Sequence, residues 1–205
     1  MKNTYESLEI TRKISESIEG GTFHHHYYIL LDIVNSYPED YSVNYVEIGC
    51  YAGGSSCLVS QRKNTNLFSI DLGHPISKEI PINNVKKFNI NNNQFQYIQG
   101  DSKKIITLNE LKKYLNEIDV LFIDGDHSFN GVKSDFELYS PLVKKGGYII
   151  FDDYNDKQHS PSVKPAVDEI VSMINGYEII GTIPNIHGAR PKELLEGNCF
   201  IIKKI

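Results

Sequence analysis

The sequence lacks the features that mark membrane and nucleic-acid-binding proteins. Its 205 residues contain no apolar run near the roughly 20 residues that span a bilayer, and the polar start MKNTYESLEITRK lacks the apolar core of a signal peptide. The net charge of −5 does not provide the broad positive field of a nucleic-acid binder. We therefore expect a cytoplasmic protein without membrane or nucleic-acid partners.

Cysteine is also scarce. The three cysteines, Cys50, Cys57 and Cys199, are an odd number and include no CxxC spacing. This pattern argues against a disulfide framework and against a thiolate zinc site. We expect three small buried side chains.

The length and the composition favour one folded domain. The chain is 40% hydrophobic and 23% charged, which supplies enough apolar material for a core. Residues 1–40 are predicted to be an N-terminal helical segment packed on the core, in which residues 27–34 have helical apolar spacing. Residues 41–205 would form the rest of a single structural domain.

Apolar runs alternate with helical patterns along the whole chain. Such alternation, with nearly continuous apolar strand interiors, indicates an α/β fold with a mostly parallel seven-stranded sheet and helices on both faces. The expected strands are 43–49, 67–71, 95–100, 119–127, 148–154, 177–183 and 198–204, and the main expected helices are 57–61, 103–118, 128–143 and 162–175.

A glycine-rich turn follows the first strand, in the segment VEIGCYAGGSS. Glycines let a backbone approach a ligand closely, and the next helix offers unpaired N–H groups to a carboxylate or a phosphate. The spacing of Gly49, Gly53 and Gly54 departs from GxGxxG, and a plain tight turn remains an alternative. Asp71 ends the next strand, where a carboxylate can accept hydrogen bonds from ribose hydroxyls. Together these features suggest a nucleoside ligand.

Three acids, Asp124, Asp152 and Asp153, follow two other strands. Carboxylate oxygens suit hard cations such as magnesium, manganese or calcium, and converging carboxylates require a counter-charge. Adjacent strand residues point to opposite faces, so Asp152 and Asp153 can both bind one ion only if the strand ends or bends there. One of the pair could instead be a solvated loop acid.

The segments VEIGCYAGGSS, FSID, QGDS and FIDGDHSFNGVKSDFELYSPLVKKGGYIIFDDY together resemble successive motifs of class I S-adenosylmethionine-dependent methyltransferases, over roughly residues 44–153. The DGDH and DD motifs are similar to those of metal-dependent O-methyltransferases, in the branch with macrolide-sugar O-methyltransferases and cephalosporin-biosynthesis enzymes. The resemblance implies a Rossmann-like domain, S-adenosylmethionine as cofactor, and a divalent cation, with magnesium favoured and manganese as the alternative.

The resemblance also assigns residues. It implies that the methionine end of the cofactor is lined by Glu47, Gly49 and Gly53, that Asp71 holds the ribose, and that Asp101 and Ser102 lie near the adenine. Ser55 and Asp124 complete the implied cofactor site, and the implied metal ligands are Asp124, Asp152 and Asp153. A partly buried structural carboxylate is the alternative for Glu47.

His127 stands where this family places a general base, and imidazole titrates close enough to neutrality to accept a hydroxyl proton. With Asp124, it is the predicted catalytic pair. For Asp126 there are two equal alternatives: it belongs to the site, or it caps the following helix. Consecutive residues of a helix point about 100° apart, so His24, His25 and His26 cannot all bind one ion.

These features predict an O-methyltransferase that acts on a hydroxyl of a sugar, glycan or glycosylated small molecule. A catechol-like acceptor, a non-catalytic cofactor-binding protein and an NAD-dependent oxidoreductase are the alternatives, and a homo-oligomer is left open. Polar residues in the loops near the strand ends suit a hydroxyl-rich or phosphorylated acceptor. They are Tyr154, Asn155, His159, Asn185, His187 and Arg190.

Overall fold

The computed structural model describes residues 4–21, 25–182 and 198–205. The chain divides into two compact units, Met1–Asp101 (unit 1) and Ser102–Ile205 (unit 2), and each is described by itself. The predicted loop residues Asn185, His187 and Arg190, and also His24, lie outside the described ranges. Within those ranges, no helix has the length and apolar character needed to cross a membrane.

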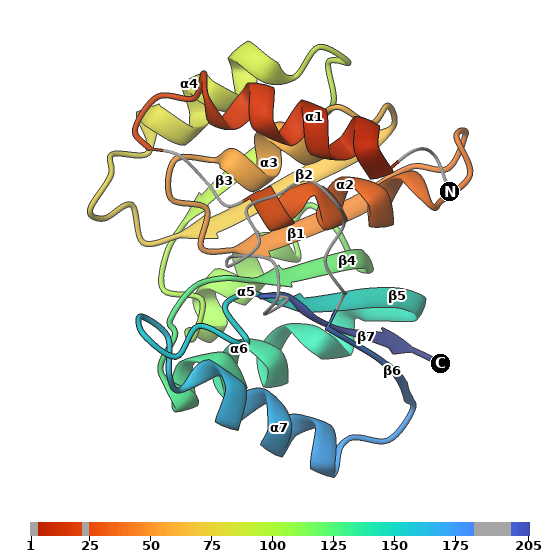
Figure 1. Cartoon of the computed structure of the whole chain (residues 1–205). Helices are drawn as coiled ribbons and strands as arrows, with labels where there is room; N and C mark the ends of the chain where they lie inside the picture. Colours follow the sequence, from red (N-terminus) through yellow and green to blue (C-terminus); the bar gives the residue numbers. More distant parts are fainter. Residues whose placement is uncertain (1–3, 22–24, 183–197) are drawn as a thin grey trace. The chain divides into compact units, whose positions relative to one another are not determined.

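Unit 1 is a parallel sheet with its helices (Figure 1). Strand β2 lies between β1 and β3, and residues Ile48, Ile70 and Ile98 are in register near the carboxyl ends of the three strands. The residues that follow these ends are therefore neighbours at one edge of this sheet. The elements are α1 (Thr4–Ser15), α2 (Tyr28–Asn35), β1 (Val43–Ile48), α3 (Gly54–Val59), β2 (Thr65–Asp71), α4 (Glu79–Phe88) and β3 (Phe95–Gln99).

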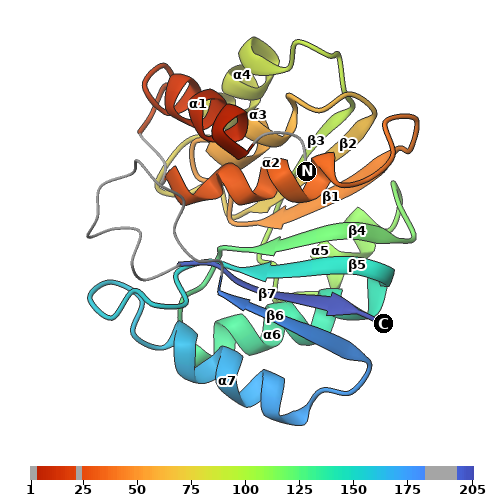
Figure 2. The ribbon, with the colours of Figure 1, turned by 45° about the vertical axis from the view of Figure 1, so that its right-hand side comes forward.

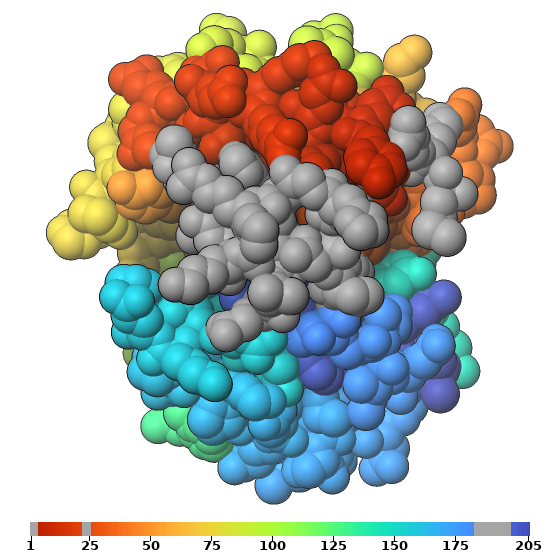
Figure 3. Space-filling model, viewed as in Figure 1, coloured from red at the N-terminus to blue at the C-terminus, as the bar shows by residue number. Residues whose placement is uncertain are grey.

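The core of unit 1 forms because β1 and β2 are apolar on both faces. Almost every residue of these two strands is buried, as expected for parallel strands covered on both sides. Helix α1 packs against α2 and α3 and buries Leu8 and Ile14. The helix also buries the small polar residues Ser7, Thr11 and Ser15, whereas its charged residues Glu6, Glu9 and Lys13 are exposed. Helices α1 (red) and α4 (yellow-green) are visible on the surface in Figure 3. Helix α1 lies within residues 1–40, the segment predicted to be helical, but ahead of residues 27–34, which have the helical apolar spacing.

Unit 2 is a mixed sheet in the order β4-β5-β7-β6 (Figure 2). Strand β4 is parallel to β5, whereas β7 runs antiparallel to both β5 and β6. Helices α6 and α7 pack against each other. The elements are α5 (Ile105–Leu111), β4 (Ile118–Ile123), α6 (Phe129–Tyr139), β5 (Val143–Phe151), α7 (Val163–Met173), β6 (Tyr177–Thr182) and β7 (Phe200–Lys204), with a short 3₁₀ helix at Ser140–Leu142.

Three predicted boundaries in unit 2 are wrong. The helix expected over 128–143 ends at Tyr139, and β5 begins at Val143 rather than at residue 148. The strand runs through the two glycines because Gly146 adopts a positive φ of 80° and the pairing with β4 shifts register there. The helix expected over 103–118 ends at Leu111 and is followed by turns. The predicted α/β class, with seven mostly parallel strands, is confirmed for the described residues.

Candidate functional site

The predicted glycine turn joins β1 to α3 in unit 1. Gly49 and Gly53 both have φ of 82°, and Gly53 directly precedes the first residue of α3. A Cβ on Gly53 would lie 3.1 Å from the Cα of Pro81 in α4. Glycine is therefore required here by backbone conformation and by close packing.

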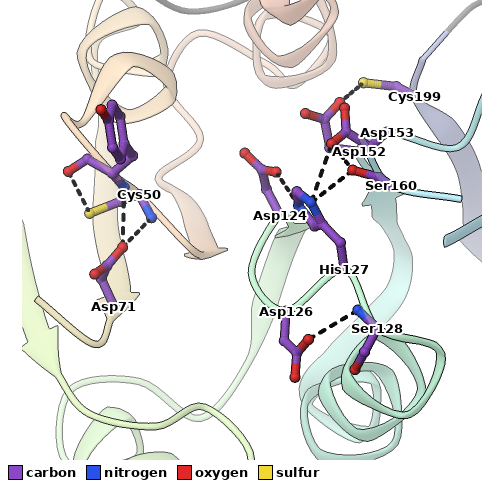
Figure 4. Close-up of polar contacts among 11 residues, drawn as sticks. Cys50, Asp71, Asp124, Asp126, His127, Ser128, Asp152, Asp153, Ser160 and Cys199 are labelled. Carbon is purple, nitrogen blue, oxygen red and sulfur yellow. Dashed lines mark hydrogen bonds and ion pairs between the residues drawn. The ribbon is translucent and has the colours of Figure 1, made fainter. Parts of the chain in front are cut away.

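Asp71 fastens this turn to the end of β2. Its Oδ2 accepts the backbone N–H groups of Cys50, at 2.9 Å, and Tyr51, at 3.1 Å, and its Oδ1 accepts the N–H of Gly73 at 2.7 Å. Figure 4 shows the carboxylate turned toward the turn. Asp71 is half-buried, so it holds the turn in place while part of its side chain reaches solvent. The ribose role remains a prediction.

Glu47 lies beneath the turn in the interior of unit 1. It is fully buried, and its carboxylate accepts hydrogen bonds from the hydroxyls of Tyr45, Ser55, Ser56 and Ser69. Burial raises the pKa of this carboxyl, and the four hydroxyls oppose that effect. Ser55, another predicted cofactor residue, is thus already bonded to Glu47.

The two adenine-side candidates follow β3. Asp101 ends unit 1 and Ser102 begins unit 2, and both are half-buried. The carbonyl of Ser102 accepts the phenol of Tyr139 at 3.0 Å, which fixes the start of unit 2 to the end of α6. Their predicted contact with adenine stays a prediction.

Unit 2 brings together His127, Asp124 and Asp153 at the ends of β4 and β5 (Figure 4). The Nε2 of His127 is 3.2 Å from Asp124 Oδ1, and its Nδ1 is 3.4 Å from Asp153 Oδ2. The hydrogen bond to Asp124 raises the pKa of His127 to about 9, against the effect of burial. Without another cation, His127 is therefore a half-buried imidazolium that compensates the acids.

The strand bends between the two adjacent acids. Asp152 continues the sheet, since its N–H donates to the carbonyl of Ile123 at 3.0 Å, but Asp153 has a positive φ of 55°. Both side chains are buried on the same side of the loop, the condition that a shared ion requires. Burial, and next the negative charge of Asp152, raise the pKa of Asp153.

The potential metal-ligand atoms that lie closest to one another differ from the predicted set of Asp124, Asp152 and Asp153. One atom from each of Asp124, His127 and Asp153 lies within 4.8 Å of the others. Asp152 instead turns Oδ1 toward the thiol of Cys199, at 3.4 Å between oxygen and sulfur. The assignment of Asp152 as a third carboxylate ligand stays a prediction, and it would require a rotation away from Cys199.

Asp126 is bonded to the start of α6. Its Oδ1 accepts the N–H of Ser128 at 3.0 Å, and Lys103 pairs with Oδ2 at 2.6 Å and lowers the pKa to about 2. Ser128 is the N-cap residue and accepts the N–H of Gly131 at 3.0 Å. A Cβ on Gly131 would collide with Asp126, at 2.4 Å from its Cγ. These contacts favour the helix-start role of Asp126.

The loop after β5 contains one residue that the sequence did not single out, Ser160, and three that it did. Ser160 is buried and bonds to both His127 and Asp153, but its spacing gives no signal of this contact. Tyr154 is buried, and its phenol donates to Asp168 of α7 at 2.6 Å, a bond that holds the side chain against this helix. Asn155 is half-buried and His159 is exposed.

The comparisons with known proteins identify relatives across the chain. The model of a family described as a methyltransferase domain matches residues 46–154. An uncharacterised protein of Acanthamoeba polyphaga mimivirus is 42% identical over 184 residues, which cover 85% of this chain and 83% of that protein.

Solved structures match the fold at low sequence identity. An O-methyltransferase from Bacillus cereus in complex with SAH has a TM-score of 0.67 at 16% identity, covering 97% of this chain and 91% of that one. The O-methyltransferase NovP has a TM-score of 0.66 at 16% identity, covering 98% and 99%. An SAH-bound methyltransferase of Podospora anserina has a TM-score of 0.65 at 14% identity, covering 100% and 88%. The predicted Rossmann-like methyltransferase fold is confirmed.

Proposed function

The chain belongs to the methyltransferase family, the class I, S-adenosylmethionine-dependent enzymes, and from this premise we propose that it methylates a hydroxyl oxygen with the help of a divalent cation. We propose a sugar, a glycan or a glycosylated small molecule as the carrier of that hydroxyl. The observation that carries the proposal is the cluster of Asp124, His127 and Asp153, which places an imidazole between carboxylates at the ends of β4 and β5.

The residues of unit 1 fit the cofactor. Gly49 and Gly53 leave the two ends of the turn without side chains, and Asp71 holds the backbone of the turn while remaining half-buried. Such a turn before a helix can accept the carboxylate end of an amino acid, and a strand-end acid can bind ribose hydroxyls. We assign these two tasks to the turn and to Asp71, respectively.

The residues of unit 2 fit a divalent cation. Asp152 and Asp153 are adjacent, buried and of like charge, an arrangement that favours a counter-ion. Carboxylate oxygens with a nearby imidazole suit magnesium or manganese. We propose that Asp124, Asp152 and Asp153 hold the ion. When bound, such a cation acts as a Lewis acid that lowers the pKa of a coordinated hydroxyl.

His127 is the proposed general base. A base must be neutral to accept a proton, whereas Asp124 and Asp153 hold His127 as an imidazolium when nothing else compensates them. Neutralisation of these two carboxylates removes the interactions that retain the proton. The same acids therefore make His127 available as a base only when the site carries its cation.

The acceptor is the least constrained part of the proposal. Asn155 and His159 offer polar groups in the loop after β5, whereas the phenol of Tyr154 is engaged with Asp168. Polar side chains of this kind suit a hydroxyl-rich acceptor better than the flat face of a catechol. Two of the matched structures are O-methyltransferases by description, which agrees with oxygen as the methylated atom.

The test is transfer of a labelled methyl group from S-adenosylmethionine to a panel of acceptors. The panel contains nucleotide sugars, glycosylated small molecules, catechols and RNA, each with magnesium. We expect label on a sugar hydroxyl, and loss of that label in Asp153→Asn but not in Asp168→Asn, a surface carboxylate of α7. Exclusive labelling of catechols would move the assignment to that class, and stabilisation of the protein by NAD rather than S-adenosylhomocysteine would contradict methyl transfer.

A further inference from the structure

Ser160 connects the imidazole of His127 to the carboxylate of Asp153. Its side chain is only 2% exposed, and its Oγ lies 2.9 Å from His127 Nδ1 and 2.7 Å from Asp153 Oδ2 (Figure 4). The backbone fixes this position from both sides. The N–H of Ser160 donates to the carbonyl of Asp156 at 3.2 Å, and its carbonyl accepts the N–H of Val163 at 3.1 Å.

The three groups form a chain of hydrogen bonds with one direction. A hydroxyl has a single hydrogen, and an ionised carboxylate only accepts. Ser160 therefore donates to Asp153, and its oxygen must accept the Nδ1–H of His127. The direct contact between Nδ1 and Asp153, at 3.4 Å, is longer than either of these bonds.

We propose that Ser160 is a positioning residue that keeps the proton of neutral His127 on Nδ1, so that the lone pair of Nε2 accepts the proton of the methylated hydroxyl. The inference rests on the proposed role of His127 as the base. Which imidazole nitrogen carries the proton is set by the hydrogen bond that the other nitrogen makes. After the transfer, His127 carries one N–H toward Ser160 and one toward Asp124.

Asp124 has the opposite effect on the position of the His127 proton. Its Oδ1 lies 3.2 Å from Nε2 and attracts a proton to that nitrogen. A cation held by Asp124 offsets this attraction, whereas the bond from Nδ1 to Ser160 involves a neutral acceptor and persists. The effect of Ser160 is therefore expected in the cation-loaded protein.

The tautomer can be measured directly. Nitrogen-15 NMR of histidine-labelled protein with magnesium and S-adenosylhomocysteine, under conditions where His127 is neutral, should show hydrogen on Nδ1 and none on Nε2. In Ser160→Ala the hydrogen should move to Nε2, and kcat should fall roughly 10–100-fold, the usual effect of losing an outer-shell partner, with KM for S-adenosylmethionine unchanged. Ser160→Thr, which keeps the hydroxyl, should restore both.

Ser172→Ala is the matched control. This α7 serine donates to the carbonyl of Glu169 at 2.7 Å and has no role in the contacts of His127 described above. A wild-type spectrum with hydrogen on Nε2 overturns the inference, whether or not Ser160→Ala folds. An unchanged tautomer and kcat in Ser160→Ala overturns it also. Hydrogen on Nδ1 in a protein that methylates no hydroxyl supports the role of Ser160 and contradicts the proposed function instead.

Discussion

The carboxylates of the two units are compensated in different ways. In unit 1, Glu47 accepts four side-chain hydroxyls and Asp71 accepts three backbone N–H groups. In unit 2, Asp152 and Asp153 lie side by side in a buried bend, where Asp152 contacts the thiol of Cys199 and Asp153 contacts the hydroxyl of Ser160 and the imidazole of His127. Neutral donors thus satisfy Glu47 and Asp71, whereas Asp153 has the charged imidazole of His127 among its partners.

Because of this difference, we expect the acids of the glycine turn in unit 1 to keep their partners in all conditions, whereas the cluster in unit 2 changes with pH and with bound cations. The hydroxyls and amides around Glu47 and Asp71 belong to the fold and keep the glycine turn in one conformation. The imidazolium of His127 compensates Asp124 and Asp153 only while it retains its proton. We expect ligands and pH to change the energetics of unit 2 far more than those of unit 1.

The largest effect is expected from His127→Ala. Loss of a positioned general base lowers the rate roughly 10²–10⁴-fold, whereas affinity for S-adenosylhomocysteine should stay the same because the turn and Asp71 are untouched. Single-turnover methyl transfer and calorimetry measure the two quantities. Lys112→Ala removes an exposed side chain of the same unit and should leave kcat unchanged. Near-normal turnover in His127→Ala would assign this residue a structural role.

Asp71→Ala should weaken the binding of S-adenosylhomocysteine. The change removes charged hydrogen bonds to the turn and the proposed ribose contact, at a cost of roughly 1–3 kcal/mol, or about 5–150-fold in Kd. Isothermal calorimetry measures the shift, with Asp40→Ala as an exposed control in unit 1. Equal affinities of Asp71→Ala and wild type would remove Asp71 from the cofactor site.

Ser56→Ala tests whether unit 1 is held by its own donors. The hydroxyl of Ser56 donates to Glu47 at 2.8 Å and lies 2.9 Å from the hydroxyl of Ser69, in a fully buried position. Its loss should lower the free energy of unfolding by roughly 1–3 kcal/mol, with or without magnesium. Urea denaturation measures this change. A loss no larger than that of Ser36→Ala, at an exposed serine, would refute the prediction.

The smallest effect is a pH dependence of stability in unit 2. The raised pKa of His127, about 9 against an ordinary 6.5, means that its stabilisation is complete below about pH 6.5 and is lost as the pH rises through about 9. In chelator, the Tm of wild type should fall relative to His127→Asn across this window. Since the side chain is 36% exposed, solvent screening limits the loss to about 1 kcal/mol, or roughly 2–4 °C. Parallel curves would contradict the ion pair.

The sequence predicted the strands better than the helix ends. The seven apolar runs appear as strands, and burial on both faces leaves a strong pattern in β1, β2 and β4, whereas β6 is largely exposed. The methyltransferase family is confirmed. The end of α6 and the start of β5 were misplaced, since Gly146 and Gly147 are usual signals for the end of a helix. Here they lie within a strand, because pairing with β4 outweighs the local preference.

Part of the candidate site could not be predicted. The DGDH and DD motifs placed Asp124, His127 and Asp153 at neighbouring strand ends, and the structure brings them together. The contact of Ser160 depends on the path of a loop with no periodicity, and the bond between Cys199 and Asp152 joins residues 47 positions apart. Neither contact follows from residue type or spacing.

The most direct test of the central claim is removal of divalent cations from the active protein. Using an acceptor that carries label in the panel, the initial rate of methyl transfer is measured in excess chelator and again after magnesium or manganese is restored. We expect the rate to fall to background in chelator and to recover fully when the metal is restored. The affinity for S-adenosylhomocysteine should be retained throughout, since Glu47 and Asp71 have their hydrogen-bond donors within unit 1. An undiminished rate in excess chelator would contradict the central claim, and Asp152 and Asp153 would then be acids that orient the acceptor through hydrogen bonds.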